Sequence, residues 1–279
     1  MSRFSTKRNI LICGGIFLFI GLSIYLYFDA FHPLSRFRTM QDEIVSTEQV
    51  DLRGLREMKV SGGSAPHFAD LQNQLSHVNL DKLIIDAKTE SPGYIDGRPT
   101  SFFRYDLPGP RPKHVIRRLY YTGSLRERPD LIVPVAEEAK KYGFEYKSVH
   151  IGSKFIAPDK DIDEIVSLFD SIPQSTWIHI HCRNGDGRTS MLIVMLDMMK
   201  NAPTVSLNDI IKRQHLLGSA DLFNTVVWTK GGTYSKKQLE DRKHFIENFY
   251  EFAVQRKAGG IHLWSEWKRE KDNAQKGEA

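Results

Sequence analysis

A single stretch in the second half of the chain places the strongest constraint on the fold. Residues 177–182 have β-branched, aromatic or histidine side chains and end in Cys182. This pattern predicts a buried strand. Residues 191–200 are largely apolar and predict a buried helix. The connection between them carries Gly185 and Gly187, which let the backbone close up where a side chain would clash. The sequence therefore predicts a strand, a glycine loop and a helix in direct succession.

This succession is suited to binding an anion. Successive backbone N–H groups in a tight turn form a nest, and the following helix N-terminus adds partial positive charge. Arg188 presents a planar guanidinium group that can hold two phosphate oxygens. Cys182 lies in the same positive field, and such fields lower a cysteine pKa to roughly 3.5–7.5. We therefore expect a thiolate beneath a bound phosphate, where it can act as a nucleophile in phosphoryl transfer.

Residues 181–189 read His-Cys, five further residues up to and including Gly187, then Arg and Thr. This pattern resembles the signature loop of cysteine-dependent phosphatases, the protein tyrosine phosphatase superfamily. With both glycines present it is close to the tyrosine-phosphatase-like inositol polyphosphatases, which are phytase-like bacterial enzymes. The resemblance extends over about 37–267 and includes an Arg-Gln-His segment at 213–215. It implies the tyrosine-phosphatase α/β fold and hydrolysis of phosphomonoesters through a phosphocysteine intermediate, without a metal.

The composition is that of a globular chain. The 279 residues are 41% hydrophobic and 26% charged, which suits one large domain. The formal charge of +5 favours a polyanionic substrate, but it is too small to indicate nucleic acid without interleaved aromatic and basic residues. Cys13 and Cys182 are the two cysteines, so a disulfide framework is excluded from the catalytic part. No zinc pattern is present in the sequence, and we expect no cofactor.

The N-terminal segment has the composition of a membrane anchor. Residues 10–28 are apolar or small throughout and follow Arg3, Lys7 and Arg8, so the segment is long enough to span a bilayer. We predict an uncleaved anchor within residues 1–30, which makes the membrane a partner. The catalytic domain then lies on the non-cytoplasmic side, in the periplasm if the organism is bacterial. The alternative is a cleaved signal peptide and a secreted protein.

Strand and helix signals alternate along residues 31–267, the predicted phosphatase domain. They predict an α/β fold with a largely parallel central sheet flanked by helices. Strands are predicted at 83–86, 115–121, 146–151 and 177–182, and helices at 69–77, 129–142, 159–172, 191–200, 207–217 and 235–256. A loop-rich or small β subdomain is expected at about 91–118. Residues 268–279 form a charged tail that we expect to be disordered.

Several further residues are predicted to support the reaction. Thr189 can donate its hydroxyl group to the sulfur, and His181 can orient the loop through its ring nitrogens. The resemblance suggests that Arg183, together with Lys154, binds a second phosphate, although both can instead be solvated surface charges. It also suggests that Gln214 places the hydrolytic water. The remaining phosphate contacts are expected from Asn184, Gly185 and Gly187.

The general acid of the family is missing at its expected position. In the family an aspartate four residues before a proline protonates the leaving group; the matching proline is Pro158, and Lys154 stands four residues earlier. Asp186, in the signature loop, can substitute, although it adds negative charge beside the phosphate. The other nearby carboxylates suit the charge preference of a helix N-terminus better; they are Asp159, Asp161 and Asp163.

We therefore predict an active phosphatase with an atypical acid, in which Cys182, Arg188 and Asp186 are catalytic. The expected substrate is an inositol polyphosphate or a related compound with several phosphates. One alternative is a phosphotyrosine or dual-specificity protein phosphatase. Another is a catalytically weak pseudophosphatase that serves as a binding module for a phosphorylated ligand.

Overall fold

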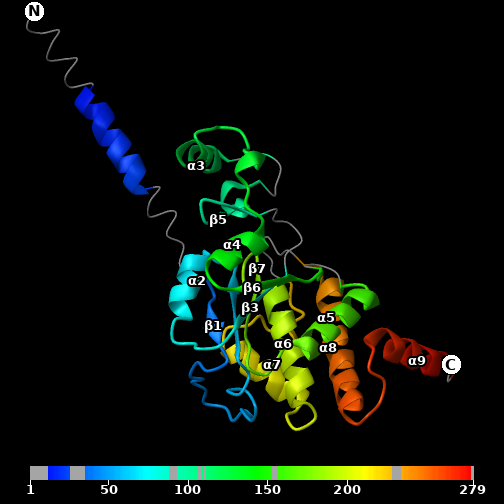
Figure 1. The fold of residues 1–279 in the computed structure, drawn as a ribbon. Coiled ribbons are helices and arrows are strands. Elements are labelled where there is room, and N and C mark those ends of the chain that lie inside the picture. The colour runs from blue at the N-terminus through cyan, green and yellow to red at the C-terminus, as the bar shows by residue number, and fades with distance from the viewer. Residues whose placement is uncertain are drawn as a thin grey trace, which may run out of the picture.

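The computed structural model describes residues 12–25, 35–87, 93–105, 109, 111–152, 156–227 and 234–277. Its centre is a five-stranded sheet in the order β1-β2-β7-β3-β6 (Figure 1). The strands are β1 (Arg38–Thr39), β2 (Val60–Ser64), β7 (Trp177–Cys182), β3 (Lys82–Asp86) and β6 (Glu145–Ser148). Of these, β1 is antiparallel to its neighbour, and the other pairs are parallel. The predicted α/β class with a largely parallel sheet is confirmed.

The central strand β7 brings the cysteine to one edge of the sheet. All six of its residues are buried, which is the pattern of a strand covered on both faces. Cys182 lies opposite Ser64 of β2, and His181 lies opposite Asp86 of β3. The carboxyl ends of three parallel strands therefore meet at the same edge, where open α/β sheets bind their ligands.

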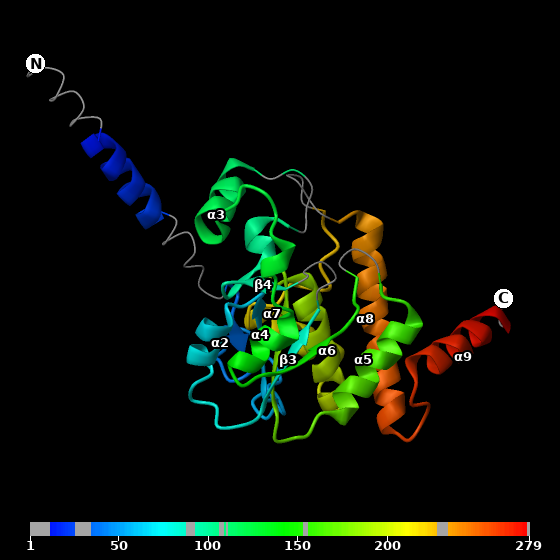
Figure 2. The ribbon, with the colours of Figure 1, turned by 45° about the horizontal axis from the view of Figure 1, so that its top comes forward.

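Helices cover both faces of the sheet (Figure 2). One face carries α5 (Asp159–Ser171), α6 (Gly187–Asn201), α7 (Leu207–Leu216) and α8 (Lys236–Lys257), and the other carries α2 (Phe68–Gln74) and α4 (Val135–Lys141). Alternate residues of β3 contribute to the two cores, with Leu83 and Ile85 on the larger side and Ile84 on the smaller. The helices predicted at 159–172, 207–217 and 235–256 are confirmed to within one residue.

Local capping explains why two of these helices begin where the sequence predicts. Asp209 donates its backbone N–H to the Ser206 hydroxyl group over 3.1 Å at the start of α7. Ser235 and Gln238 form a reciprocal capping box at the start of α8. Both arrangements satisfy backbone donors that the first helical turn leaves unpaired.

The strand predicted at 115–121 is wrong, because this segment belongs to helix α3 (Pro112–Thr122). The helix ends in the left-handed backbone of Gly123, at φ 67°. Arg117 is buried in it, and its guanidinium group lies 4.0 Å from the ring centroid of Phe102. A charged side chain thus faces inward on α3, which an apolar pattern cannot reveal.

The start of another helix differs from the sequence expectation. The helix predicted at 129–142 begins only at Val135, because Pro134 is the residue that precedes its first turn. Residues Pro129–Leu131 form a separate 3₁₀ turn, η2.

The tail predicted to be disordered from 268 continues helix α9 (Trp264–Gly277) as far as the described residues reach. Trp264 and Trp267 are buried, and their rings lie 5.8 and 6.0 Å from the ring of Phe252 on α8. These aromatic contacts anchor the start of α9, so its charged remainder can stay helical.

A small subdomain follows the carboxyl end of β3. It consists of β4 (Tyr94–Ile95), β5 (Arg98–Pro99), η1 (Thr100–Phe103) and α3. Ile95, Phe102 and Phe103 form its own apolar cluster. Figures 1 and 2 both show it beyond the edge of the sheet, on the side where β3 leads into it. The subdomain predicted at about 91–118 falls on this segment.

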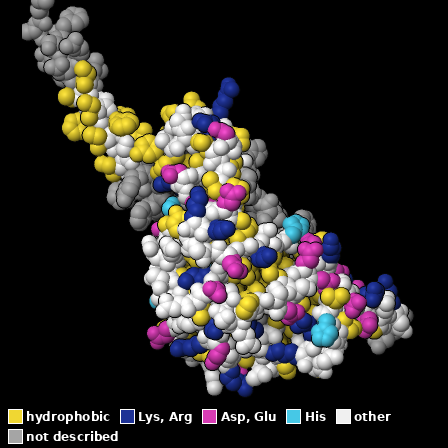
Figure 3. Space-filling view, in the orientation of Figure 1, with side chains coloured by type: hydrophobic (Ala, Val, Ile, Leu, Met, Phe, Trp, Pro, Cys, Tyr) yellow, Lys and Arg dark blue, Asp and Glu magenta, His cyan; other side chains and the backbone are white. Residues whose placement is uncertain are grey.

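The prediction of an N-terminal membrane anchor is wrong. Residues 12–25 form a helix that projects from the domain, and its apolar side chains are prominent in Figure 3. The remainder of the predicted segment 10–28 lies outside the described residues. A span requires about 20 consecutive apolar residues. Across the ranges that the structure describes, each helix is too short or too polar to cross a bilayer. The predicted location of the catalytic domain beyond a membrane is overturned with the anchor.

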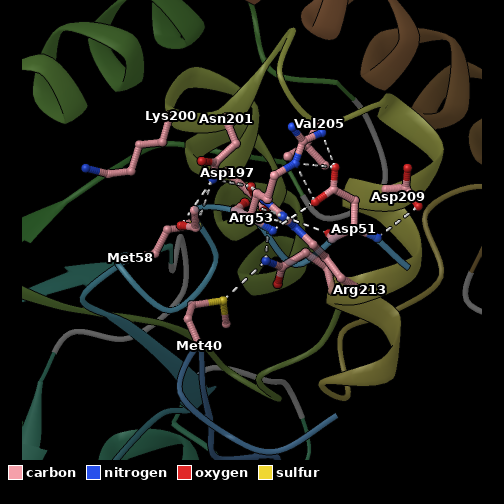
Figure 4. Close-up of polar contacts among 12 residues, drawn as sticks. Met40, Asp51, Arg53, Met58, Asp197, Lys200, Asn201, Val205, Asp209 and Arg213 are labelled. Atoms are coloured by element: carbon pink, nitrogen blue, oxygen red, sulfur yellow. Dashed lines mark hydrogen bonds and ion pairs between the residues drawn. The ribbon is translucent and has the colours of Figure 1, made fainter. Parts of the chain in front are cut away.

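A buried polar cluster ties α6 to α7 (Figure 4). Arg213 is paired with Asp197 through two hydrogen bonds, one of them 3.0 Å from Nε to Oδ2. The same guanidinium group donates to the backbone carbonyls of Asp51 and Arg53 over 3.0 and 2.9 Å. This cluster fixes the carboxyl half of α6, the helix whose other end begins at the glycine loop.

Candidate active site

The loop between β7 and α6 is packed directly against the end of β2. Gly185 has a left-handed backbone with φ 68°, and a Cβ atom there would lie 2.4 Å from backbone atoms of Gly63 and Ser64. The close approach expected at this glycine is confirmed. A Cβ atom on Gly187 would lie 3.1 Å from the Tyr234 hydroxyl group, so this position is tight but less strictly required.

The sulfur of Cys182 is enclosed by hydrogen-bond donors. Cys182 is 3% exposed. Its burial by itself raises the pKa of the thiol, but hydrogen bonds from the Thr189 hydroxyl group and from the backbone N–H groups of Thr189 and Asn184 oppose this. Together with the charge of Arg188 they lower the pKa of Cys182 below its ordinary value. The sulfur therefore has the surroundings of a thiolate, in the direction that the sequence predicts.

A pocket of about 250 Å³ opens over this sulfur. Its lining residues are Cys182, Asn184, Asp186, Gly187, Arg188, Ala220, Tyr234 and Arg242. The structure thus brings together the cysteine, the arginine and the acidic residue of the signature loop. A larger hollow of about 810 Å³ lies at the opposite edge of the sheet, where Lys82 begins β3 and Ser175 precedes β7. Its lining has no nucleophile beside a cationic cradle, so the smaller pocket is the candidate active site.

Two polar residues of the pocket wall, Tyr234 and Arg242, escaped the sequence analysis. Arg242 donates to the backbone carbonyls of Asp221 and Asn224 over 3.1 and 3.3 Å. Among the described residues its buried Nε atom has no hydrogen-bond partner. Burial lowers the pKa of Arg242 and raises the pKa of Tyr234. Arg242 belongs to α8, Tyr234 lies just before that helix, and nothing in their local sequence connects them with the loop.

A third residue that the sequence analysis missed, Arg38, holds the loop from beneath. It is 2% exposed and donates over 3.0 Å to the carbonyls of Arg36 and Gly185. The hydroxyl groups of Ser219 and Ser190 accept its other hydrogen bonds, over 3.1 and 3.3 Å. Burial lowers the pKa of Arg38 to about 10, so the side chain stays charged at neutral pH. The hydrogen bond from Arg38 fixes the orientation of the Gly185 carbonyl within the loop.

His181 lies behind the loop rather than in the pocket. Its Nδ1 atom is 3.5 Å from Oδ1 of Asp86, and Oδ2 of Asp86 accepts a 3.1 Å hydrogen bond from the hydroxyl group of Tyr146. These residues sit on the adjacent strands β7, β3 and β6. The arrangement suits the supporting role predicted for His181.

The other predicted site residues have different positions. Asp186 stands at the rim of the pocket and forms an ion pair with Arg36. Arg183 is half-buried outside the lining set, and its carbonyl accepts from the backbone N–H of Ala65 over 3.4 Å. Lys154 lies outside the described residues.

The role predicted for Gln214 is corrected by the structure. Its side chain is 0% exposed and donates to Oδ2 of Asp197 over 2.8 Å and to the sulfur of Met40 over 3.2 Å. Because α7 turns this residue into the core against α6, the side chain does not line the pocket.

The acidic residues at the start of α5 are engaged in structural contacts. Asp159 accepts from the indole N–H of Trp264 over 2.8 Å. Asp163 accepts from the backbone N–H of Ser265 over 3.1 Å. Asp161 lies 2.5 Å from Nδ1 of His150. These contacts join the start of α5 to α9 and to His150, whereas no side chain among the described residues caps the helix itself.

Comparisons with known proteins agree with this geometry. Residues 130–200 match the model of the PTP-like phytase family, described by the words inositol hexakisphosphate. The tandemly repeated PTP-like phytase of Mitsuokella multacida has a TM-score of 0.67 and 25% identity, over 85% of this chain and 45% of that one. A PTP-like myo-inositol phosphatase of the same organism, solved with myo-inositol-(1,3,4,5)-tetrakisphosphate, has a TM-score of 0.67 and 24% identity, over 86% and 46%. This chain therefore spans less than half the length of these two proteins.

A relative in sequence is the uncharacterized protein AvrBs1.1 of Xanthomonas euvesicatoria. It is 39% identical over 92 residues, which are 32% of this chain and 86% of the relative.

Proposed function

Because the chain belongs to the family of PTP-like phytases, we propose that it is a cysteine-dependent phosphatase acting on phosphomonoesters. The observation that carries the proposal is the sulfur of Cys182, which receives three hydrogen bonds and shares one pocket with Arg188. A sulfur in these surroundings is a nucleophile rather than a buried structural thiol.

The reaction that we propose has two steps. In the first, the thiolate of Cys182 attacks phosphorus, an S–P bond forms, and the ester P–O bond breaks as the leaving oxygen takes up a proton. In the second, water attacks phosphorus, loses a proton and displaces the sulfur, which releases inorganic phosphate. The loop N–H groups and Arg188 stabilise the negative charge of the transferred group in both steps.

We propose that Asp186 exchanges the protons of both steps, since it is the carboxylate in the pocket lining. Its ion pair with Arg36 holds this side chain at the rim of the pocket, from where it can accept a proton from water in the second step. The aspartate of the family is absent from its usual position, where Lys154 stands, and a poor leaving group depends most on help from an acid. Substrates with good leaving groups should therefore turn over faster than alkyl phosphates, because a positioned acid contributes typically 10²–10⁴-fold.

The proposed substrate is an inositol polyphosphate or a related ester with several phosphates. Arg188 and Arg242 line the pocket, and Arg36 is paired with Asp186 of the same lining. The complex of the Mitsuokella protein with an inositol tetrakisphosphate supports this class. The alternatives are a phosphotyrosine or dual-specificity substrate, and a binding module with little turnover, which the pairing of Asp186 with a cation favours.

The test is phosphate release by the full chain from a small aryl phosphate and from inositol hexakisphosphate. We expect release from both, faster from the aryl phosphate, and none from Cys182→Ser, which should still bind inorganic phosphate. Turnover retained in Cys182→Ser contradicts the proposal. Binding without turnover by the unaltered chain supports the binding module instead.

A further inference from the structure

Arg36 and Asp186 form an ion pair at the mouth of the pocket. We propose that Arg36 is a subsite for a second phosphate group of the substrate, and that Asp186 anchors its side chain there. The inference rests on the proposed function, because it assigns a ligand class to the rim of the same pocket. It differs from the sequence expectation, which placed this subsite at Arg183 and Lys154.

The backbone of Arg36 is held firmly in a strained conformation. Its φ is 59°, in the left-handed region that side chains other than glycine rarely adopt. The preceding carbonyl, of Ser35, accepts from the backbone N–H of Ser64 over 3.0 Å. The carbonyl of Arg36 accepts from Arg38, which also holds Gly185 of the loop. Such strain persists where neighbouring contacts enforce it, and it concentrates at functional sites.

The position of Asp186 makes a neighbouring cation necessary. Its carboxylate lines the pocket, and its charge acts on Arg38, Tyr234 and Arg242, which surround the loop. A carboxylate this close to the loop repels a bound phosphate dianion. Arg36 cancels that charge, so the remaining cations can act on the phosphate without this opposition.

The pair leaves part of the guanidinium group available. The side chain of Arg36 is 51% exposed, and that of Asp186 is 43% exposed. A guanidinium group has five N–H donors, and a carboxylate engages two of them at most in a fork. The donors directed away from Asp186 can therefore bind a phosphate oxygen that projects from the pocket mouth. A substrate with a single phosphate has no group to place there.

A binding experiment separates this inference from the proposed function. The full chain with Cys182→Ser is titrated calorimetrically with inorganic phosphate and with inositol hexakisphosphate, and compared with the same chain carrying Arg36→Ala, Asp186→Asn or both. The matched control is Arg53→Ala. The side chain of Arg53 is 67% exposed and forms an ion pair of 2.5 Å with Asp51, and neither residue lines the pocket.

We expect Arg36→Ala to weaken inorganic phosphate about tenfold, because Asp186 is then unscreened, and inositol hexakisphosphate by a further factor of about ten. The double variant should recover the affinity for inorganic phosphate but not for inositol hexakisphosphate. Equal losses for both ligands, full recovery of both, or a loss matched by Arg53→Ala overturn the subsite. Turnover by the unaltered chain without this binding pattern contradicts only the inference, and the binding pattern without turnover contradicts only the proposed enzyme activity.

Discussion

Arg38 and Arg213 are both almost completely buried, yet their partners differ in charge. Arg213 is paired with the carboxylate of Asp197, which is itself fully buried, and with two backbone carbonyls (Figure 4). The hydrogen bonds of Arg38, among the described residues, go to carbonyl and hydroxyl oxygens that carry no net charge. The charge of Arg213 is therefore neutralised by its partner, whereas the charge of Arg38 remains beside the loop.

The difference separates a structural arginine from a functional one. The neutralised pair of Arg213 and Asp197 joins α6, α7 and the segment that contains Asp51, but it contributes little electrostatic potential to the pocket. An uncancelled charge is expensive to bury, and burial lowers the pKa of Arg38 to about 10 for that reason. The protein retains this cost where the charge can act on the thiolate of Cys182 and on a bound phosphate.

The largest effect is expected from Asp197→Ala. It leaves the Arg213 charge buried without its partner, and we expect a loss of about 3–5 kcal/mol in the free energy of unfolding. Urea denaturation measures it, with Asp241→Ala as the control, because Asp241 forms an exposed ion pair with Lys237 on α8. If Asp197→Ala lowers the free energy of unfolding no more than Asp241→Ala does, Arg213 is not the structural arginine of this comparison.

The next effect is expected from Arg38→Met, which keeps the length of the side chain and removes its charge. The variant loses the donor to Gly185 and a nearby positive charge. We therefore expect the pKa of Cys182 to rise and the free energy of phosphate binding to weaken by about 1.5–3 kcal/mol. The alkylation rate of Cys182 against pH gives the pKa, in a Cys13→Ser background because Cys13 is exposed.

Arg38→Lys keeps the positive charge but not the planar guanidinium group. The pKa of Cys182 in this variant should therefore lie between its values in Arg38→Met and in the native chain. An unchanged pKa of Cys182 in Arg38→Met would show that Arg38 is a second structural arginine, like Arg213.

A smaller effect is expected from Thr189→Val, which removes one hydroxyl hydrogen bond to the sulfur with little change of shape. We expect the pKa of Cys182 to rise, with a loss of about 1 kcal/mol in thiolate stabilisation. Thr189→Ser retains the hydroxyl group and should behave like the native chain. The same alkylation profile measures both, and equal profiles for Val and Ser contradict the assigned hydrogen bond.

The smallest effect is a dependence of stability on pH. Since the pKa of Cys182 is lowered in the folded state, the unfolded state binds more protons between that value and the unfolded pKa of about 8.5. The stabilisation is fully present above pH 8.5 and is lost as the pH falls through the folded pKa. Under reducing conditions, the free energy of unfolding of the native chain should therefore rise relative to that of Cys182→Ala as the pH increases to about 8.5. A difference that does not change with pH contradicts the lowered pKa.

The sequence predicted best the elements whose signals are local. The segment from β7 through the loop into α6 is contiguous, so its buried run, glycines and arginine could be interpreted together. The helices predicted at 207–217 and 235–256 begin beside Ser206 and Ser235, whose side chains cap them locally. The assignment failed at α3 and α9, where side chains from other segments decide the conformation: Phe102 stacks on Arg117, and Phe252 packs on Trp264.

The candidate site was predictable to the same extent. Gln214 was assigned to the pocket from its segment alone, but the direction in which α7 presents it depends on packing against α6. Arg38, Tyr234 and Arg242 were missed because they reach the loop from segments far away in the chain.

The sequence by itself determined that a thiol, a glycine turn and an arginine share one loop, for which we propose anion binding, since bond geometry keeps neighbours along a chain close together. Only the tertiary structure decided which distant charges surround that loop, and which of them are cancelled. Coulomb interactions depend on separation and burial in space, and neither can be obtained from the order of residues.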